Sequence, residues 1–218
     1  MIDYILFDLD GTLTDPKEGI TRCVSYALRA FGIVEDDLDK LTKFIGPPLL
    51  DSFMEFYGFD EEQARHAIEV YRERFSTIGV FENGVYEGII PMLRKFRDSG
   101  KVLALSTSKP WVFAERILEK FELAEYFTVV VGSELDGRLT DKAEVIAETL
   151  ARLGNGADVR ERSIMVGDRR HDIAGAKKNG ILSLGVKFGY AEENELEEAG
   201  ADYIAETVSN AENILLSL

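Results

Sequence analysis

The sequence predicts an α/β fold: a Rossmann-like, doubly wound parallel sheet that is interrupted by an inserted helical domain. In the C-terminal part, short and nearly continuous apolar runs alternate with amphipathic stretches, which is typical of parallel strands buried on both faces and joined by crossover helices. One similar run, Ile5-Leu6-Phe7, stands near the N-terminus, and the long segment after it carries helical patterns only. We expect the lone first strand to join the same sheet, so the helical segment is an insertion.

The strands of the predicted core follow in a regular order. The apolar runs expected to form the sheet are 5–7, 102–106, 129–131, 164–166, 182–184 and, more weakly, 203–204. Amphipathic stretches at helical spacing lie around 89–96, 111–121, 141–153 and 172–178. This alternation of strand and helix indicates βαβ units with a parallel sheet.

The inserted segment reads as four consecutive amphipathic helices. We expect the first to begin at Asp15-Pro16, with Asp15 as the N-cap and Glu18 closing a capping box, and to end at Gly32. A second helix is expected over 38–45, a third over 49–57, and a fourth after a capping box at 60–63. Short loops between them predict a small bundle. The expected domains are therefore a core of 1–14 and 83–218 and a helical cap of 15–82.

Composition and charge exclude several classes of function. The 218 residues include 25 Lys and Arg against 40 Asp and Glu, a formal net charge of −15. Such a charge repels nucleic acids and anionic membranes, so neither is expected as a partner. The single cysteine, Cys23, excludes an internal disulfide framework and a cysteine-based zinc site. With no secretion signal and no membrane-spanning apolar run, we expect a cytoplasmic monomer or homodimer.

Acidic and polar side chains follow three of the predicted strands. Asp8 and Asp10 come after the first strand, Thr107-Ser108-Lys109 after the second, and Asp168 and Asp172 after 164–166. Ligands of open parallel sheets bind at the carboxyl ends of the strands, so these groups should converge. Clustered carboxylates repel one another unless a cation neutralises them. Mg²⁺ prefers oxygen ligands and completes its shell with substrate phosphate, so we predict a Mg²⁺ site for a small phosphorylated metabolite.

Four motifs in order resemble those of the haloacid dehalogenase superfamily. Asp8-Leu9-Asp10-Gly11-Thr12 is similar to its first motif, and the three others are matched by Thr107, Lys142 and Gly167-Asp168 with Asp172. The helical insertion directly after the first motif resembles the phosphoglycolate phosphatase-like branch, in which such a cap closes over small substrates. The resemblance covers nearly the whole chain and implies hydrolysis through an aspartyl-phosphate.

Phosphoryl transfer needs an in-line nucleophile, charge neutralisation and protonation of the leaving oxygen. We assign Asp8 as the nucleophile and Asp10 as the acid that later becomes the base. Phosphoryl oxygens are assigned to Thr107, Ser108 and Lys142. The resemblance implies that Asp8 and Asp168 bind Mg²⁺ through their side chains, Asp10 through its backbone carbonyl, and Asp172 mostly through water.

For several residues near the predicted site, the sequence allows both a functional and a purely structural or solvated role. Asp172 is either a metal-site residue or merely a helix cap, and Lys109 is either solvated or lines the entrance. Arg169 and Arg170 are more typical of a solvated face. Candidates for substrate specificity are Arg22, Lys109 and the loop Gly46-Pro47-Pro48. Arg22 would meet a substrate carboxylate or second phosphate, although a solvated side chain is more typical of such an arginine. The loop either contributes to specificity or simply ends a helix. If the substrate is a nucleoside monophosphate, an apolar wall for the base is expected from Phe44, Phe53 or Trp111.

The predicted function is a Mg²⁺-dependent phosphatase of small phosphomonoesters, similar to phosphoglycolate phosphatase. Alternatives are a 5′-nucleotidase that acts on nucleoside monophosphates and a sugar phosphomutase, although Asp141-Lys142-Ala143 lacks the prolines that many relatives place after the lysine. A phospho-receiver signalling module is an alternative from another class. A receiver needs no general acid two residues after its phosphoacceptor and no helical lid, whereas a hydrolase uses both.

Overall fold

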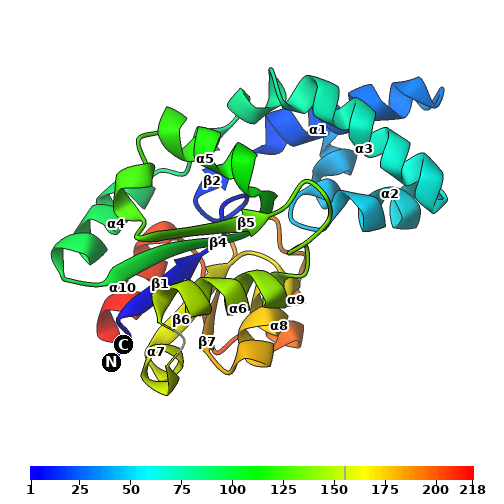
Figure 1. Cartoon of the computed structure of the whole chain (residues 1–218). Helices are drawn as coiled ribbons and strands as arrows, with labels where there is room; N and C mark the ends of the chain where they lie inside the picture. The colour runs from blue at the N-terminus through cyan, green and yellow to red at the C-terminus, as the bar shows by residue number, and fades with distance from the viewer. Residues whose placement is uncertain (155) are drawn as a thin grey trace. The chain divides into compact units, whose positions relative to one another are not determined.

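The computed structural model of the chain describes residues 1–154 and 156–218. They form two compact units, one of Met1–Asp15 with Val85–Leu218 and one of Pro16–Gly84 (Figure 1). These bounds lie within two residues of the expected 1–14, 83–218 and 15–82. Each unit is described by itself below.

The first unit is built on a parallel sheet of six strands in the order β5-β4-β1-β6-β7-β8. The strands are β1 Tyr4–Phe7, β4 Val102–Pro110, β5 Val129–Ser133, β6 Ser163–Gly167, β7 Leu182–Val186 and β8 Tyr203–Ala205. The first strand lies in the middle, where Phe7 pairs with Leu105 of β4 and Val166 of β6. From β1 the chain builds the sheet first toward β5 and then, from β6, toward β8. The expected doubly wound α/β fold is confirmed, and the order reverses beside β1.

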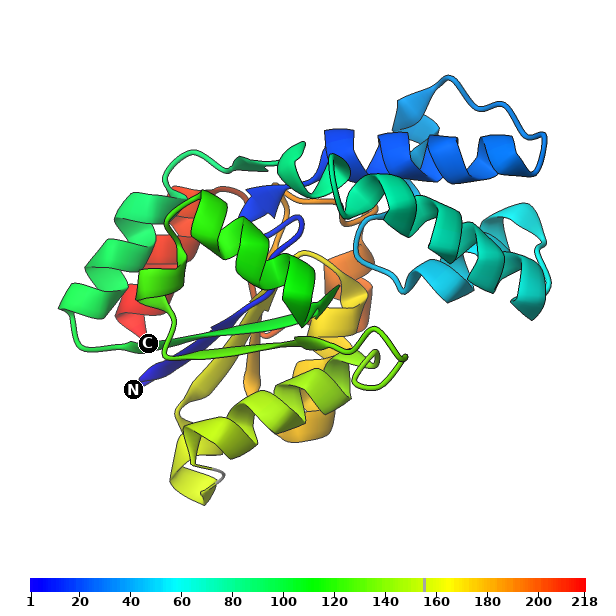
Figure 2. The same ribbon diagram turned by 45° about the horizontal axis from the view of Figure 1, so that its top comes forward.

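Helices cover both faces of this sheet (Figures 1 and 2). One face carries α4 Ile89–Asp98, α5 Trp111–Lys120 and α10 Val208–Ser217, and the other carries α6 Lys142–Leu153, α7 Ala157–Glu161, α8 Arg170–Asn179 and α9 Glu195–Ala199. Successive residues of β1 point to opposite faces: Leu6 packs with Ile146 of α6, whereas Phe7 stacks on Phe96 of α4 at 6.4 Å. Because both faces are buried, the strand is apolar throughout.

The second unit contains α1 Lys17–Ala30, a 3₁₀ helix η1 Leu38–Phe44, α2 Leu49–Tyr57, α3 Glu61–Phe75 and a 3₁₀ turn η2 Gly79–Phe81. The capping box of α3 is confirmed, since Gln63 N–H donates to Asp60 Oδ1 at 2.8 Å and Asp60 N–H to Gln63 Oε1 at 3.0 Å. The second helix is 3₁₀ rather than α over Leu38–Phe44, and it ends before Gly46-Pro47-Pro48, where each proline disfavours helical geometry in the residue that precedes it. Throughout the described residues, no helix is both long and apolar enough to span a bilayer.

The predicted N-cap of α1 is wrong. Helix α1 begins after Pro16 without a side-chain cap, and Asp15 lies instead in the short strand β2 Thr14–Asp15, which pairs with β3 Gly84–Val85. The Asp15 carboxylate accepts a hydrogen bond from the hydroxyl of Tyr190. The local sequence pattern assigned the Asp15 side chain to the start of α1, but in the structure it is hydrogen-bonded to Tyr190, 175 residues away in the sequence.

Candidate active site

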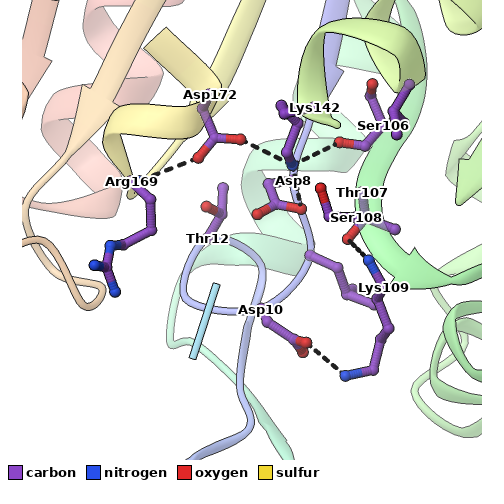
Figure 3. Close-up of polar contacts among 12 residues, drawn as sticks. Asp8, Asp10, Thr12, Ser106, Thr107, Ser108, Lys109, Lys142, Arg169 and Asp172 are labelled. Carbon is purple, nitrogen blue, oxygen red and sulfur yellow. Dashed lines mark hydrogen bonds and ion pairs between the residues drawn. The ribbon is translucent and has the colours of Figure 1, made fainter. Parts of the chain in front are cut away.

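The candidate site lies at the carboxyl ends of β1, β4 and β6. Since Phe7 is in register with Leu105 and Val166, the residues that follow these three strands meet at one edge of the sheet. Asp8 follows β1, and Thr107 lies in β4 just beyond the paired segment (Figure 3). Asp168 follows β6. All three are at most 5% exposed. The structure thus brings together the motif residues that the sequence placed at strand ends.

Three buried carboxylates form the centre of the site. Asp8, Asp168 and Asp172 each offer an oxygen atom, and these atoms lie within 4.8 Å of one another. Burial, followed by the charges of Asp172 and Asp8, raises the pKa of Asp168 well above its usual value. Burial also raises the pKa of Asp172 to about 6, although Lys142 opposes that rise. A set of oxygen donors that repel one another fits a hard divalent cation such as Mg²⁺, so this cluster could bind a metal.

The loop after β1 approaches Asp168 closely. Gly11 has a φ of +81°, and a Cβ there would lie 2.1 Å from Asp168 Oδ2. The hydroxyl of Thr12 donates to Asp168 Oδ1 at 3.2 Å. The glycine in the first motif is therefore required by space as well as by backbone conformation.

Lys142 bridges two of the carboxylates. It is the first residue of α6, where the side chain of Asp141 caps the helix, and its Nζ lies 2.9 Å from Asp8 Oδ1 and 2.8 Å from Asp172 Oδ1. Nζ also donates to the carbonyl of Ser106 at 3.1 Å. Burial alone would lower the pKa of Lys142, but the charges of Asp172 and Asp8 raise it above its usual value. The buried ammonium therefore stays charged beside Asp8.

Asp172 also contributes to the start of its helix. It is the third residue of α8, and its Oδ2 accepts the backbone N–H of Arg169 at 3.1 Å while Oδ1 faces Lys142. Asp172 thus helps to cap α8, but it is not merely a helix cap, because the same side chain also belongs to the acidic cluster.

A second cation contacts Asp10. The side chain of Lys109 is only 6% exposed, and its Nζ lies 2.5 Å from Asp10 Oδ2, so the solvated interpretation of Lys109 is wrong. Burial raises the pKa of Asp10, against the opposing charge of Lys109. The other carboxylate oxygen of Asp10, Oδ1, is buried and has no hydrogen-bond partner among the described residues. One carboxylate oxygen of Asp10 is therefore paired with Lys109, and the other has no hydrogen-bond partner among the described residues.

The segment that carries Thr107, Ser108 and Lys109 is a bulged end of β4, because the pairing with β5 shifts register between Ser106 and Pro110. Thr107 is buried, and its hydroxyl oxygen accepts the N–H of Lys109 at 3.2 Å. The carbonyl of Ser108 accepts the hydroxyl of Ser133 at 2.8 Å. These bonds hold the segment against the sheet and let Lys109 reach Asp10.

Arg169 is buried, contrary to the solvated face expected for it. Its Nε donates to Glu195 Oε1 at 3.0 Å, and the backbone N–H of Arg170 donates to the same oxygen at 2.8 Å. Arg170 itself is exposed, as expected. Glu195 was missed by sequence reasoning because α9 has only five residues, too few for a periodic pattern. This carboxylate holds the turn between Asp168 and Asp172.

The cap candidates belong to the second unit. The guanidinium of Arg22 pairs with Glu18 at 2.9 Å and with Glu82 at 3.1 Å, while Gly46 and Pro47 lie between η1 and α2. Of the aromatic candidates for a base wall, Phe44 and Phe53 are buried against each other in the core of this unit, at 5.0 Å between ring centres. The rings of Phe44 and Phe53, at most 1% exposed, therefore belong to the core of this unit. Trp111, in the first unit, is 39% exposed.

Comparison with known proteins extends the similarity over both units. A family model described as haloacid dehalogenase-like hydrolase matches residues 5–186. A 5′-nucleotidase of Pseudomonas aeruginosa is 50% identical over 192 residues, 88% of this chain and 86% of that protein. A phosphoglycolate phosphatase of Agrobacterium fabrum is 32% identical over 192 residues, 86% of this chain and 81% of that protein. The crystal structure of a predicted phosphatase from Clostridium acetobutylicum has a TM-score of 0.96 at 49% identity, with 100% of each chain covered.

In metal-free protein, Asp168→Asn is expected to raise the melting temperature at pH 8. The native pKa of Asp168 lies above that of an unfolded aspartate. The native state therefore keeps a proton that the unfolded state has released, and stability falls as pH rises through the raised pKa. A one-unit rise corresponds to about 1.4 kcal/mol once the carboxyl ionises, or roughly 3 °C for a chain of this size.

Thermal melts in EDTA at pH 5 and pH 8 measure this effect, with Asp51→Asn, at an exposed carboxylate, as the matched control. The stabilisation by Asp168→Asn should be larger at pH 8 than at pH 5, because the raised pKa keeps more of the native carboxyl protonated at the lower pH. If Asp168→Asn is less stable than wild type by the same margin at both pH values, then ionisation of Asp168 does not destabilise the native protein, and the prediction is wrong.

Proposed function

The chain belongs to the haloacid dehalogenase-like hydrolase family, and we propose that it hydrolyses small phosphomonoesters with Asp8 as the nucleophile and Mg²⁺ as the cofactor. It is a phosphoric monoester hydrolase of the phosphoglycolate phosphatase-like branch. The observation that carries the proposal is the buried cluster of Asp8, Asp168 and Asp172 with Lys142 between two of them.

Local charge explains how an acidic protein accepts a phosphate. Although the formal net charge is −15, two buried ammonium groups stand at the site, Lys142 beside Asp8 and Lys109 beside Asp10. Mg²⁺ bound by Asp8, Asp168 and the Asp10 carbonyl, with Asp172 acting through water, would add the positive charge that the phosphoryl oxygens need. Thr107, Ser108 and Lys142 are the proposed groups that hold those oxygens.

The reaction proceeds in two displacements on phosphorus. A carboxylate oxygen of Asp8 attacks, the bond to the leaving oxygen breaks, and Asp10 gives that oxygen its proton. Water then attacks the aspartyl-phosphate, Asp10 takes a proton from it, and the bond between phosphorus and Asp8 breaks to release inorganic phosphate. The Oδ1 of Asp10, which is buried and has no hydrogen-bond partner among the described residues, supports its part in both proton transfers.

Nucleoside monophosphates are the substrates we propose among the small phosphomonoesters. The relative that is 50% identical is named a 5′-nucleotidase, whereas the phosphoglycolate phosphatase is 32% identical. Arg22, the cation expected to meet the carboxylate of phosphoglycolate, is already paired with Glu18 and Glu82. Trp111, two residues after Lys109, keeps an exposed ring on which a base could stack. The Gly46-Pro47 loop stays a candidate for specificity.

A substrate panel tests this proposal. We expect kcat/KM for the best nucleoside monophosphate to exceed that for phosphoglycolate by at least about tenfold, or about 1.4 kcal/mol of transition-state binding. Trp111→Ala should lower kcat/KM for the nucleotide more than for p-nitrophenyl phosphate, and Arg22→Ala should leave the ratio of nucleotide to phosphoglycolate unchanged. A preference for phosphoglycolate that Arg22→Ala removes would reverse the substrate assignment.

A further inference from the structure

The loop that follows β7, residues 187–190, lies directly against the acidic cluster. A Cβ at Gly189 would stand 2.3 Å from the carbonyl oxygen of Gly11 and 2.6 Å from Asp168 Oδ2, so the close approach requires glycine. The backbone N–H of Tyr190 donates to Asp168 Oδ2 at 2.8 Å. Together with the hydroxyl of Thr12 on Oδ1, this bond holds both oxygens of Asp168.

The side chain of the same tyrosine reaches the point where the chain leaves the first unit. Its hydroxyl donates to Asp15 Oδ1. In the same loop, Phe188 packs edge-on against the ring of Tyr86, at 5.4 Å between ring centres. Asp15 is the last residue before the insertion, and Tyr86 follows β3 where the chain returns. The backbone of Tyr86 is tied to the same region, since its N–H donates to the carbonyl of Leu13 at 3.2 Å.

Tyr190 thus makes two kinds of contact with separate consequences. Its backbone N–H orients a carboxylate of the acidic cluster, and its hydroxyl anchors the loop to the strand that carries Asp15. Burial first, then the hydrogen bond to Asp15, raises the pKa of Tyr190, so the hydroxyl stays protonated and remains a donor. Groups that orient a metal-binding side chain in this way commonly affect metal affinity without touching the metal.

We propose that Tyr190 is a positioning residue for metal binding: its hydroxyl anchors the loop 187–190 to Asp15, and its backbone N–H thereby holds Asp168 in the orientation that binds Mg²⁺. This inference rests on the proposed Mg²⁺ site. It assigns a role to Asp15, Gly189 and Tyr190, none of which belongs to the four motifs. It also links both places where the chain crosses between the units to one carboxylate of the cluster.

Tyr190→Phe removes only the hydroxyl and is the direct test. Titration of the resting protein with Mg²⁺ in a calorimeter should show a dissociation constant about three- to tenfold higher than that of wild type. At saturating Mg²⁺, kcat should stay within about twofold of wild type, because the hydroxyl touches neither the nucleophile nor the substrate. Tyr203→Phe, which removes a hydroxyl from β8, is the matched control and should change neither quantity.

Variants at Asp15 separate positioning from a general loss of stability. Asp15→Asn keeps an acceptor oxygen for the tyrosine and should retain most of the Mg²⁺ affinity, whereas Asp15→Ala should weaken binding as Tyr190→Phe does. The double variant Tyr190→Phe with Asp15→Ala should be no weaker than either single variant, because both remove the same bond.

Equal Mg²⁺ affinity of Tyr190→Phe and wild type overturns the proposal, even if the melting temperature falls. Additive losses in the double variant also overturn it. If the wild-type protein binds Mg²⁺ but hydrolyses no phosphomonoester, the proposed function is refuted. The inference on Tyr190 is then decided by the Mg²⁺ dissociation constants of wild type and Tyr190→Phe. A wild-type protein that binds no Mg²⁺ would refute both.

Discussion

Asp8→Asn is expected to lower kcat by at least about three orders of magnitude for every phosphomonoester, or about 4 kcal/mol of activation free energy. An amide is a poor nucleophile, so the aspartyl-phosphate cannot form, and it is also a weaker metal ligand than a carboxylate. The shape of the side chain is preserved, and Lys142 keeps its ion pair with Asp172 at 2.8 Å. We therefore expect the variant to fold.

Phosphate-release assays on purified protein measure this loss, with the melting temperature as the control for folding. Asp51→Asn, a carboxylate-to-amide change on the surface of the second unit, should keep wild-type activity. In wild-type protein quenched with acid during turnover, phosphate should be recovered on the peptide that contains Asp8. Turnover by Asp8→Asn at the wild-type rate would refute the assignment of the nucleophile.

Asp10→Asn should slow the reaction by about 10²- to 10⁴-fold for alkyl phosphates, the range expected for loss of a general acid and base. A poor leaving group needs the proton of Asp10, whereas p-nitrophenolate leaves without one. In single-turnover experiments, formation of the phosphoenzyme from p-nitrophenyl phosphate should therefore be much less affected than formation from an alkyl phosphate. Hydrolysis of the phosphoenzyme should be slow for both substrates, since the base is missing in that step.

Asp10→Asn should remove the proton transfer without displacing the side chain. An asparagine at position 10 still offers an oxygen to Lys109, which lies 2.5 Å from Asp10 Oδ2, so the side chain should keep its place. Because burial raises the pKa of Asp10 against the charge of Lys109, the acid form persists to higher pH than in an ordinary aspartate. If phosphoenzyme formation from both substrates slows equally, Asp10 is not the acid.

The same chemistry distinguishes the enzyme from a receiver module. A receiver retains its phosphoryl group for seconds or longer, whereas the proposed hydrolase should release phosphate over many turnovers. In the proposed hydrolase, the buried Oδ1 of Asp10, which has no partner among the described residues, would take the proton of the attacking water.

The parallel sheet and the acidic centre of the site could be predicted from the pattern of apolar and acidic residues along the chain. Strands such as 102–106 and 164–166 were recognisable because burial on both faces demands an unbroken apolar run. In a parallel sheet, residues directly after such runs meet at one edge, so Asp8, Thr107 and Asp168 could be placed together without coordinates. Local pattern also predicted the capping box at Asp60, because both partners lie within one turn.

The partners of the polar side chains, in contrast, could not be predicted before the packing of the chain was known. Lys109 meets Asp10 across 99 residues, Arg169 meets Glu195 across 26, and Tyr190 meets Asp15 across 175. The local pattern left Lys109 either solvated or at the site entrance, favoured a solvated Arg169 and made Asp15 a helix cap. The partners come together only when distant strands and loops pack. The physical reason is that periodicity reports burial of apolar faces, whereas a hydrogen bond or an ion pair depends on which segments the fold brings within about 3 Å.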